Sequence, residues 1–93
     1  MTATEVPPVF LSNSTVNAIQ KESYQAHSRL GIKSILYGRD ERRLRLLMEK
    51  VGKIAGSLNE ADVGNQPVDE YKLEQDLIQL AAMAATWVEG KHI

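Results

Sequence analysis

Two long runs of apolar residues at helical spacing, separated by one sharp break, constrain this chain more than any other feature. Within residues 42–62 and 69–90, apolar side chains recur every three or four positions, which is the pattern of amphipathic helices. The two stripes consist of Leu44, Leu47, Met48, Val51, Ile54, Ala55 and Leu58, and of Leu73, Leu77, Leu80, Ala81, Ala84, Trp87 and Val88. Gly64 and Asn65 supply turn residues between the runs, and Pro67 suits the first turn of the later helix. The chain is therefore predicted to contain a helical hairpin.

A further helix is predicted ahead of the hairpin. The segment 12–15 offers several N-cap residues for a helix that runs to about Arg29, and Gly31 is placed to end it. Asp40 is predicted to cap the next helix, because its carboxylate would lie at the positive end of the helix dipole.

The length and charge of the chain limit its domain organisation, its assembly and its binding partners. With 93 residues, the chain is expected to form one all-α domain, residues 12–93, after an extended arm, residues 1–11. A lone core is thin at this size, so a homodimer or homotetramer built from four-helix bundles is expected. Acids and bases are interleaved at a net charge of −1, which argues against general nucleic-acid or membrane binding. No cysteine is present and no apolar run reaches transmembrane length, so we expect a cytoplasmic protein without disulfides or thiolate metal sites.

Polar side chains lie beside both apolar stripes. The spacing of three puts Lys50 and Lys53 on one face of their helix, and Asp76 and Gln79 on one face of theirs. Glu49 lies next to the first pair. Antiparallel packing of the two helices would bring these residues together near the rim of the core, where we expect any chemistry to be located.

Three segments in the predicted helices combine polar and apolar residues: 22–31 (ESYQAHSRLG), 47–56 (LMEKVGKIAG) and 76–89 (DLIQLAAMAATWVE). Taken together, they resemble the MazG-like all-α nucleoside triphosphate pyrophosphohydrolases of bacteria and their phages. ESYQAHSRLG (22–31) is similar to the family's opening Glu-Arg-x-x-Gln-x-x-Lys-Trp-Gly. LMEKVGKIAG (47–56) is similar to Leu-x-Glu-Glu-Val-Gly-Glu-Val-Ala, and DLIQLAAMAATWVE (76–89) to the Glu-Leu-Val-Gln-Val-Ala-Ala ending of short members. The resemblance covers about residues 16–89 and implies a MazG-like helical hairpin with an additional N-terminal helix.

The resemblance also implies a metal site, which this chain changes. In the family, Glu-Glu-x-x-Glu on the second helix and Glu-x-x-Asp on the third hold magnesium. Here Glu49 and Asp76 correspond to two of these acids, and the resemblance makes them the catalytic residues and magnesium ligands if the protein is active. Lys50, Lys53 and Gln79 replace the other three. Because magnesium requires anionic oxygens and ammonium groups repel it, the usual site is predicted to be impaired.

The role of Lys50 and Lys53 is open to three interpretations. They clamp a nucleotide's phosphates in place of the metal, or they neutralise neighbouring acids in a structural remnant, or an engineered charge reversal disabled the site. Gln79 belongs to the same candidate phosphate-binding set. The resemblance adds further candidates at polar positions that reach the substrate in the family: Gln25, Arg29 and Lys33.

Three functions follow. The first is a catalytically impaired MazG-like protein that binds a nucleotide or a protein partner in the former active-site cleft. The second is a working magnesium-dependent enzyme that cleaves a nucleoside triphosphate to the monophosphate and pyrophosphate. The third is a small oligomeric adaptor without a nucleotide role. The basic cluster at the start of the second predicted helix is interpreted as a solvated face, with steering of a nucleotide's phosphates as the alternative: Arg39, Arg42, Arg43 and Arg45.

Overall fold

A computed structural model describes residues 10–30 and 39–92 of the chain. These residues form three α-helices, α1 (Asn13–Leu30), α3 (Asp40–Val63) and α4 (Glu70–Lys91), and this part of the chain contains no strand. The all-α prediction is confirmed. Phe10 and Leu11, the described end of the predicted arm, are exposed. The predicted helix stop at Gly31 and the rest of the arm lie outside the described residues.

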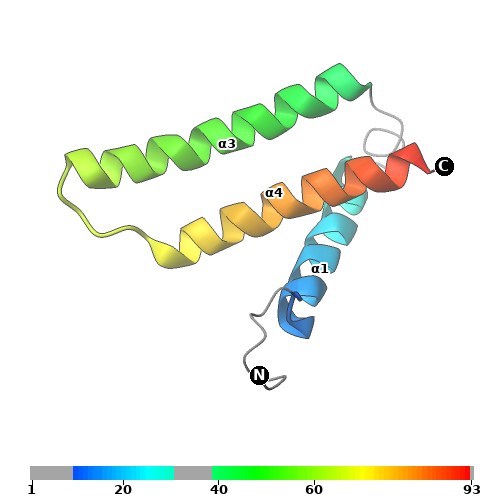
Figure 1. Cartoon of the computed structure of the whole chain (residues 1–93), viewed down its shortest axis with the longest axis horizontal. Helices are drawn as coiled ribbons and strands as arrows, with labels where there is room; N and C mark the ends of the chain where they lie inside the picture. Colours follow the sequence, from blue (N-terminus) through cyan, green and yellow to red (C-terminus); the bar gives the residue numbers. More distant parts are fainter. Residues whose placement is uncertain (1–9, 31–38, 93) are drawn as a thin grey trace, which may run out of the picture.

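The central element is α4, which packs against both α1 and α3. Figure 1 shows α3 and α4 running in opposite directions as a hairpin, with α1 crossing α4 toward its C-terminal end. At the crossing of α1 and α4, the hydroxyls of Ser23 and Thr86 are hydrogen-bonded at 2.9 Å, and Thr86 Oγ1 also donates to the carbonyl of Ala82 at 2.7 Å. The contact between Ser23 and Thr86 therefore joins α1 to the α4 helix of the predicted hairpin.

The turn between α3 and α4 agrees with the sequence-based prediction at Asn65 but not at Pro67. Asn65 adopts a left-handed conformation with φ 53°, which asparagine tolerates better than most residues. The amide of Gln66 donates to the carbonyl of Ala61 at 2.8 Å and closes the end of α3. Pro67, however, lies before α4 and not in its first turn, because Asp69 is the N-cap and accepts a hydrogen bond from the amide of Lys72 at 3.0 Å.

The other helix starts show one cap that was predicted correctly and one that was not. Ser12 Oγ accepts a hydrogen bond from the amide of Thr15 at 3.2 Å, as expected for an N-cap. Asp40 does not cap α3, because it is already the first helical residue and Arg39 occupies the N-cap position without a side-chain hydrogen bond. The Asp40 carboxylate instead accepts hydrogen bonds from Trp87 Nε1 and Lys91 Nζ, both at 2.8 Å, and ties the start of α3 to the end of α4.

The stripe of α3 that contacts α4 is not the predicted apolar stripe. The stripe that turns inward is buried or half-buried at every position: Arg43, Leu47, Lys50, Ile54, Ser57 and Ala61. Only Leu47 and Ile54 belong to both stripes. The remaining predicted positions lie about 100° further around the helix and are exposed: Leu44, Met48, Val51, Ala55 and Leu58. The apolar stripe therefore packs against α4 only through Leu47 and Ile54.

The resulting core is small. Among residues 10–26 and 39–92, Ile54 and Ala82 are the only apolar side chains that are buried. On α4, Leu77 and Val88 of the predicted stripe are exposed as well. Arg43 is 8% exposed, so the interpretation of the arginine cluster as a solvated face is wrong for this residue, whereas Arg39, Arg42 and Arg45 are exposed.

Candidate functional site

The hairpin brings together three of the polar residues expected to meet. Lys50 on the inward stripe of α3 donates hydrogen bonds to Asp76 Oδ1 at 3.1 Å and to Gln79 Oε1, both on α4. The spacing of three between Asp76 and Gln79 places both acceptors on the side of α4 that faces Lys50. The side chains of Lys50 and Asp76 are 19% and 15% exposed, so this contact is sheltered but not dry.

Lys53 and Glu49 do not join this cluster. Both are exposed, and neither forms a hydrogen bond or ion pair with any residue in the described part of the chain. The reason is the rotation of α3: Lys50 lies on the inward stripe, whereas positions 49 and 53 are about 120° and about 80° away from its centre. The two lysines therefore do not form one matched pair in the cleft.

The remaining candidates are spread over α1 and the segment after it. Gln25 lies on an exposed part of α1. Arg29 belongs to the last turn of α1, and its side chain lies outside the description. Lys33 lies outside the described residues as well. Of these three, only Gln25 has a described side chain, and it does not join the cluster formed by Lys50, Asp76 and Gln79.

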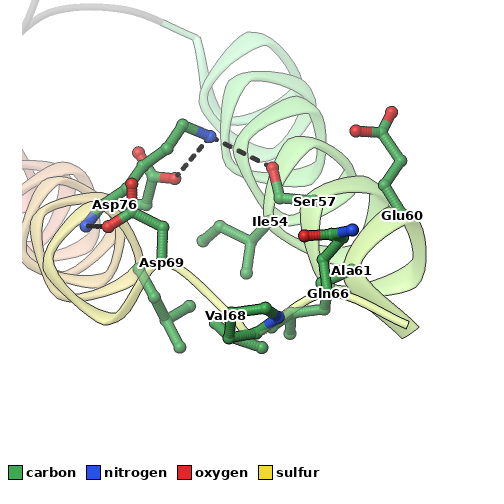
Figure 2. A pocket seen from close by; sticks show the side chains of 12 residues that line it. Ile54, Ser57, Glu60, Ala61, Gln66, Val68, Asp69 and Asp76 are labelled. Carbon is green, nitrogen blue, oxygen red and sulfur yellow. Dashed lines mark hydrogen bonds and ion pairs between the residues drawn. The ribbon is translucent and has the colours of Figure 1, made fainter. Parts of the chain in front are cut away.

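Sequence reasoning missed Lys72, which belongs to the same cluster. Lys72 Nζ lies 3.7 Å from Asp76 Oδ2 and donates a hydrogen bond to Ser57 Oγ at 3.1 Å (Figure 2). The spacing of four between Lys72 and Asp76 is the signal that could have identified the pair, since such residues are neighbours on a helix surface. The contact with Ser57, in contrast, depends on how α3 packs against α4.

These contacts act on the charge of Asp76. The hydrogen bond from Lys50 is the main cause that holds the pKa of the Asp76 carboxyl below its usual range, and Lys72 adds to it. Partial burial acts in the opposite direction but is the smaller effect. Asp76 therefore remains a carboxylate at neutral pH, with a lysine next to each of its oxygens.

The donor set does not fit magnesium. Residues 10–30 and 39–92 contain no group of three or more histidine or carboxylate side chains that could hold a metal ion. Among the residues that the structure describes, Asp76 is the one carboxylate with a recorded contact to Lys50, and its oxygens already face two ammonium groups. A hard divalent cation would have to displace these ammonium groups and would find no second anionic oxygen in the cluster.

An open hollow of about 300 Å³ adjoins the cluster at the turn end of the hairpin. Figure 2 shows Ser57, Asp69 and Asp76 around it, with Ile54 and Val68 among the side chains that form its apolar part. A mainly apolar surface beside a few polar groups is typical of sites for small organic ligands.

Comparisons with known proteins complete the description. No helix in the described part of the chain is both long and apolar enough to cross a membrane. When the chain is compared with protein-family models, with curated proteins and with solved structures, it shows no significant match to any of them.

Proposed function

We propose that this chain is a MazG-like helical protein that does not hydrolyse nucleotides and that binds a nucleotide, without metal, between α3 and α4. The observation that carries the proposal is the position of the Lys50 ammonium group, which is hydrogen-bonded to both Asp76 and Gln79. The resemblance places two metal-holding acids at positions 76 and 79. An internal cation in contact with both positions is incompatible with a magnesium-dependent reaction there.

The same cluster retains groups that bind phosphate. An ammonium group has three N–H donors, and two of those of Lys50 have acceptors, so one is left for a ligand oxygen. Lys72 is 59% exposed and lies on the rim of the hollow, where its ammonium can turn toward a phosphate. The apolar part of the hollow, which includes Ile54 and Val68, suits a base or sugar.

Titration of the purified protein with a panel of nucleoside triphosphates, with and without magnesium, tests this proposal. Heat of binding and released pyrophosphate are measured in the same samples. We expect the same affinity in both conditions and no pyrophosphate. Lys72→Ala should weaken binding, whereas Arg45→Ala, which removes an exposed charge on the other side of α3, should not. Pyrophosphate release that requires magnesium would refute the proposal and restore the enzyme hypothesis, with Glu49 and Asp76 as the next residues to mutate.

The proposal includes assembly with further copies of the chain, as a homodimer or homotetramer with four-helix bundles. The chain exposes 7458 Å², whereas a folded monomer of this size exposes roughly 5,400 Å². Its radius of gyration is 16.0 Å, against about 12 Å for a compact domain of the same length. The exposed stripe Leu44, Met48, Val51, Ala55 and Leu58 supports packing of α3 against a second copy.

Size-exclusion chromatography with light scattering tests the assembly. Met48 is 64% exposed near the middle of this stripe, so Met48→Glu is expected to leave a monomer or an unfolded chain. Lys53→Glu, at an exposed position on the opposite side of α3, should keep the native mass. An unchanged assembly in Met48→Glu would exclude this face as the contact.

The exposed stripe also favours one alternative, an oligomeric adaptor without a nucleotide role. An apolar helix face of this length suits a protein partner as well as a second copy. The two functions are separated by the titration: an intact oligomer that binds no nucleotide in either condition would support the adaptor.

A further inference from the structure

The buried arginine Arg43 is not part of the site formed by Lys50, Asp76 and Gln79. Arg43 is 8% exposed, and its Nε and Nη2 are buried without a hydrogen-bond partner in the described part of the chain. Five N–H donors in a guanidinium group require acceptors, and a buried charge without them is costly. Burial lowers the pKa of Arg43 from its ordinary value, but arginine stays protonated at neutral pH. The unpaired donors therefore point to an anion as their missing partner.

The guanidinium lies at the N-terminal end of α3. The charged groups that act on it are those of Asp40 and Arg42, both in the first turn of this helix. Helical side chains also lean toward the N-terminus of their own helix, which directs Arg43 the same way. At this end Arg39 provides no side-chain cap, and the first amides of an α-helix have no acceptor within the helix itself. Free amides and the positive end of the helix dipole favour an anion.

The charge at this end is positive on balance. Residues 39–45 contain four arginines and two carboxylates. Asp40 is already bound by Lys91 and Trp87, and these contacts lower the pKa of its carboxyl. Glu41 is exposed and makes only a 3.9 Å contact with Arg39 Nε. Arg39 is the exposed, extended residue directly before the first turn of α3, so it lies at this end of the helix.

We propose that the N-terminal end of α3 is a binding site for a phosphoryl group, formed by Arg43, Arg39 and the first amides of α3. A guanidinium presents two parallel N–H donors, which match two oxygens of a phosphate. The site is separate from the cleft cluster. Figure 1 shows the start of α3 and the end of α4 at one end of the hairpin and the turn at the other. Asp40 pairs with Lys91 at the first end, whereas the hollow beside Asp76 is lined by turn residues such as Gln66 and Pro67.

Fluorescence of the single tryptophan is the direct readout, because Trp87 donates its indole N–H to Asp40 next to the site. The protein is titrated with inorganic phosphate, pyrophosphate, a nucleoside triphosphate and, at equal ionic strength, sodium chloride. We expect saturable binding of the phosphoryl compounds and none with chloride. The order of affinity among the three compounds identifies whether a free phosphate or a nucleotide is the natural source.

Three variants locate the binding. Arg43→Met should weaken pyrophosphate binding at least about tenfold, because it removes charged donors without adding a polar group. Arg43→Lys should bind with intermediate affinity, since it keeps the charge and loses the paired donors. Arg45→Gln removes the same charge from the opposite side of α3 and should bind like the natural chain. Circular dichroism confirms that each variant is helical, and Arg43→Lys decides the case if Arg43→Met does not fold.

Equal pyrophosphate binding by the natural chain and Arg43→Lys, or no saturable binding by the natural chain, would overturn the proposal. Lys72→Ala separates it from the proposed nucleotide cleft. Binding of inorganic phosphate at Arg43 should survive in that variant, whereas metal-independent nucleotide affinity should fall. Loss of phosphate binding in Lys72→Ala together with no effect in the Arg43 variants would assign the anion to the cleft instead.

Discussion

At the scale of single residues, Lys50 and Lys53 show how one helical turn separates a buried role from an exposed one. Lys50 lies between α3 and α4 and contacts both Asp76 and Gln79. Lys53 is exposed and has no such contact in the described part of the chain. The interpretation of lysines that neutralise acids across the helix pair agrees with the geometry of Lys50, and a phosphate clamp of both lysines would require Lys53 to reach around α3.

The acid sensitivity of the fold should depend on Asp76. Its folded-state pKa is lowered, mainly by the hydrogen bond from Lys50, relative to about 3.9 in an unfolded chain. The ion pair therefore contributes its full stability above about pH 4, and this contribution is lost as the pH falls further through the folded-state pKa. Urea unfolding of the natural chain and Asp76→Asn at pH 7 and pH 3 measures this. The variant should be less stable at pH 7, and the difference should shrink at pH 3.

Asp40 offers the matched control, because its carboxyl pKa is lowered by Lys91 and Trp87 at the other end of the hairpin. Asp40→Asn should show a pH dependence of the same sign. A difference between Asp76→Asn and the natural chain that stays constant from pH 7 to pH 3 would contradict the role given to the Lys50 contact.

At the scale of elements, the two aspartates near helix starts have different functions. Asp69 caps α4 through the amide of Lys72, whereas Asp40 lies inside α3 and binds side chains of α4. The sequence predicted a cap at Asp40 and did not identify the one at Asp69, although aspartate is favoured at such positions. The distinction arises because Trp87 and Lys91 approach Asp40 from another helix.

Removal of the Asp69 cap is expected to cost about 1 kcal/mol of unfolding free energy, because an amide at the start of α4 loses its acceptor. Urea unfolding of Asp69→Ala measures this, and Asp69→Asn should recover most of the loss. Glu70→Ala, at the exposed next position, serves as the comparison. An equal loss in Glu70→Ala would show that charge near the helix end, and not the cap, is responsible.

The glycines of α3 give a second prediction at this scale. Gly52 and Gly56 lie in the helix, and a Cβ added to either would meet no atom within 4 Å. Alanine restricts the unfolded chain and forms helix better, so Gly56→Ala should raise the unfolding free energy by about 0.5–1 kcal/mol. Thermal and urea unfolding check this. A loss of both stability and oligomer mass would mean that another copy packs against these small residues.

At the scale of the whole molecule, the main property is a small core with a large exposed apolar surface. Ile54 and Ala82 are the buried apolar residues of the described part, while Met48, Val51 and Leu44 are about half exposed or more. Folding costs conformational entropy, and a domain of this length buries only slightly more apolar surface than is needed to offset that cost. Burying the outer stripe of α3 against another copy would add the missing surface.

The melting temperature should therefore rise with protein concentration, because association stabilises only the folded chain. Calorimetry over a hundredfold range of concentration measures the effect. Met48→Glu should melt at a lower temperature that does not change with concentration. A melting temperature of the natural chain that is independent of concentration would argue that the single chain is stable by itself.

The sequence by itself determined the three helices, the turn, the short segment that caps the first helix and the proximity of Lys50 to Asp76 and Gln79. These features depend on local preference or on helical periodicity, and both are read over a few neighbouring residues. Periodicity also identified the apolar residues of α3. It does not state which of two adjacent stripes faces α4, because Arg43 and Leu44 differ by only one position, about 100° around the helix.

Only the tertiary structure decided which stripe of α3 faces α4. As a result, Arg43 is buried, Met48 and Val51 are exposed, and Lys53 does not join the contacts of Lys50. The tertiary structure also decided that Asp40 meets Trp87 and Lys91 and that Lys72 reaches Ser57. Each of these outcomes depends on contacts between residues far apart in the chain. Such contacts are set by the packing of whole helices, which the spacing within one helix does not encode.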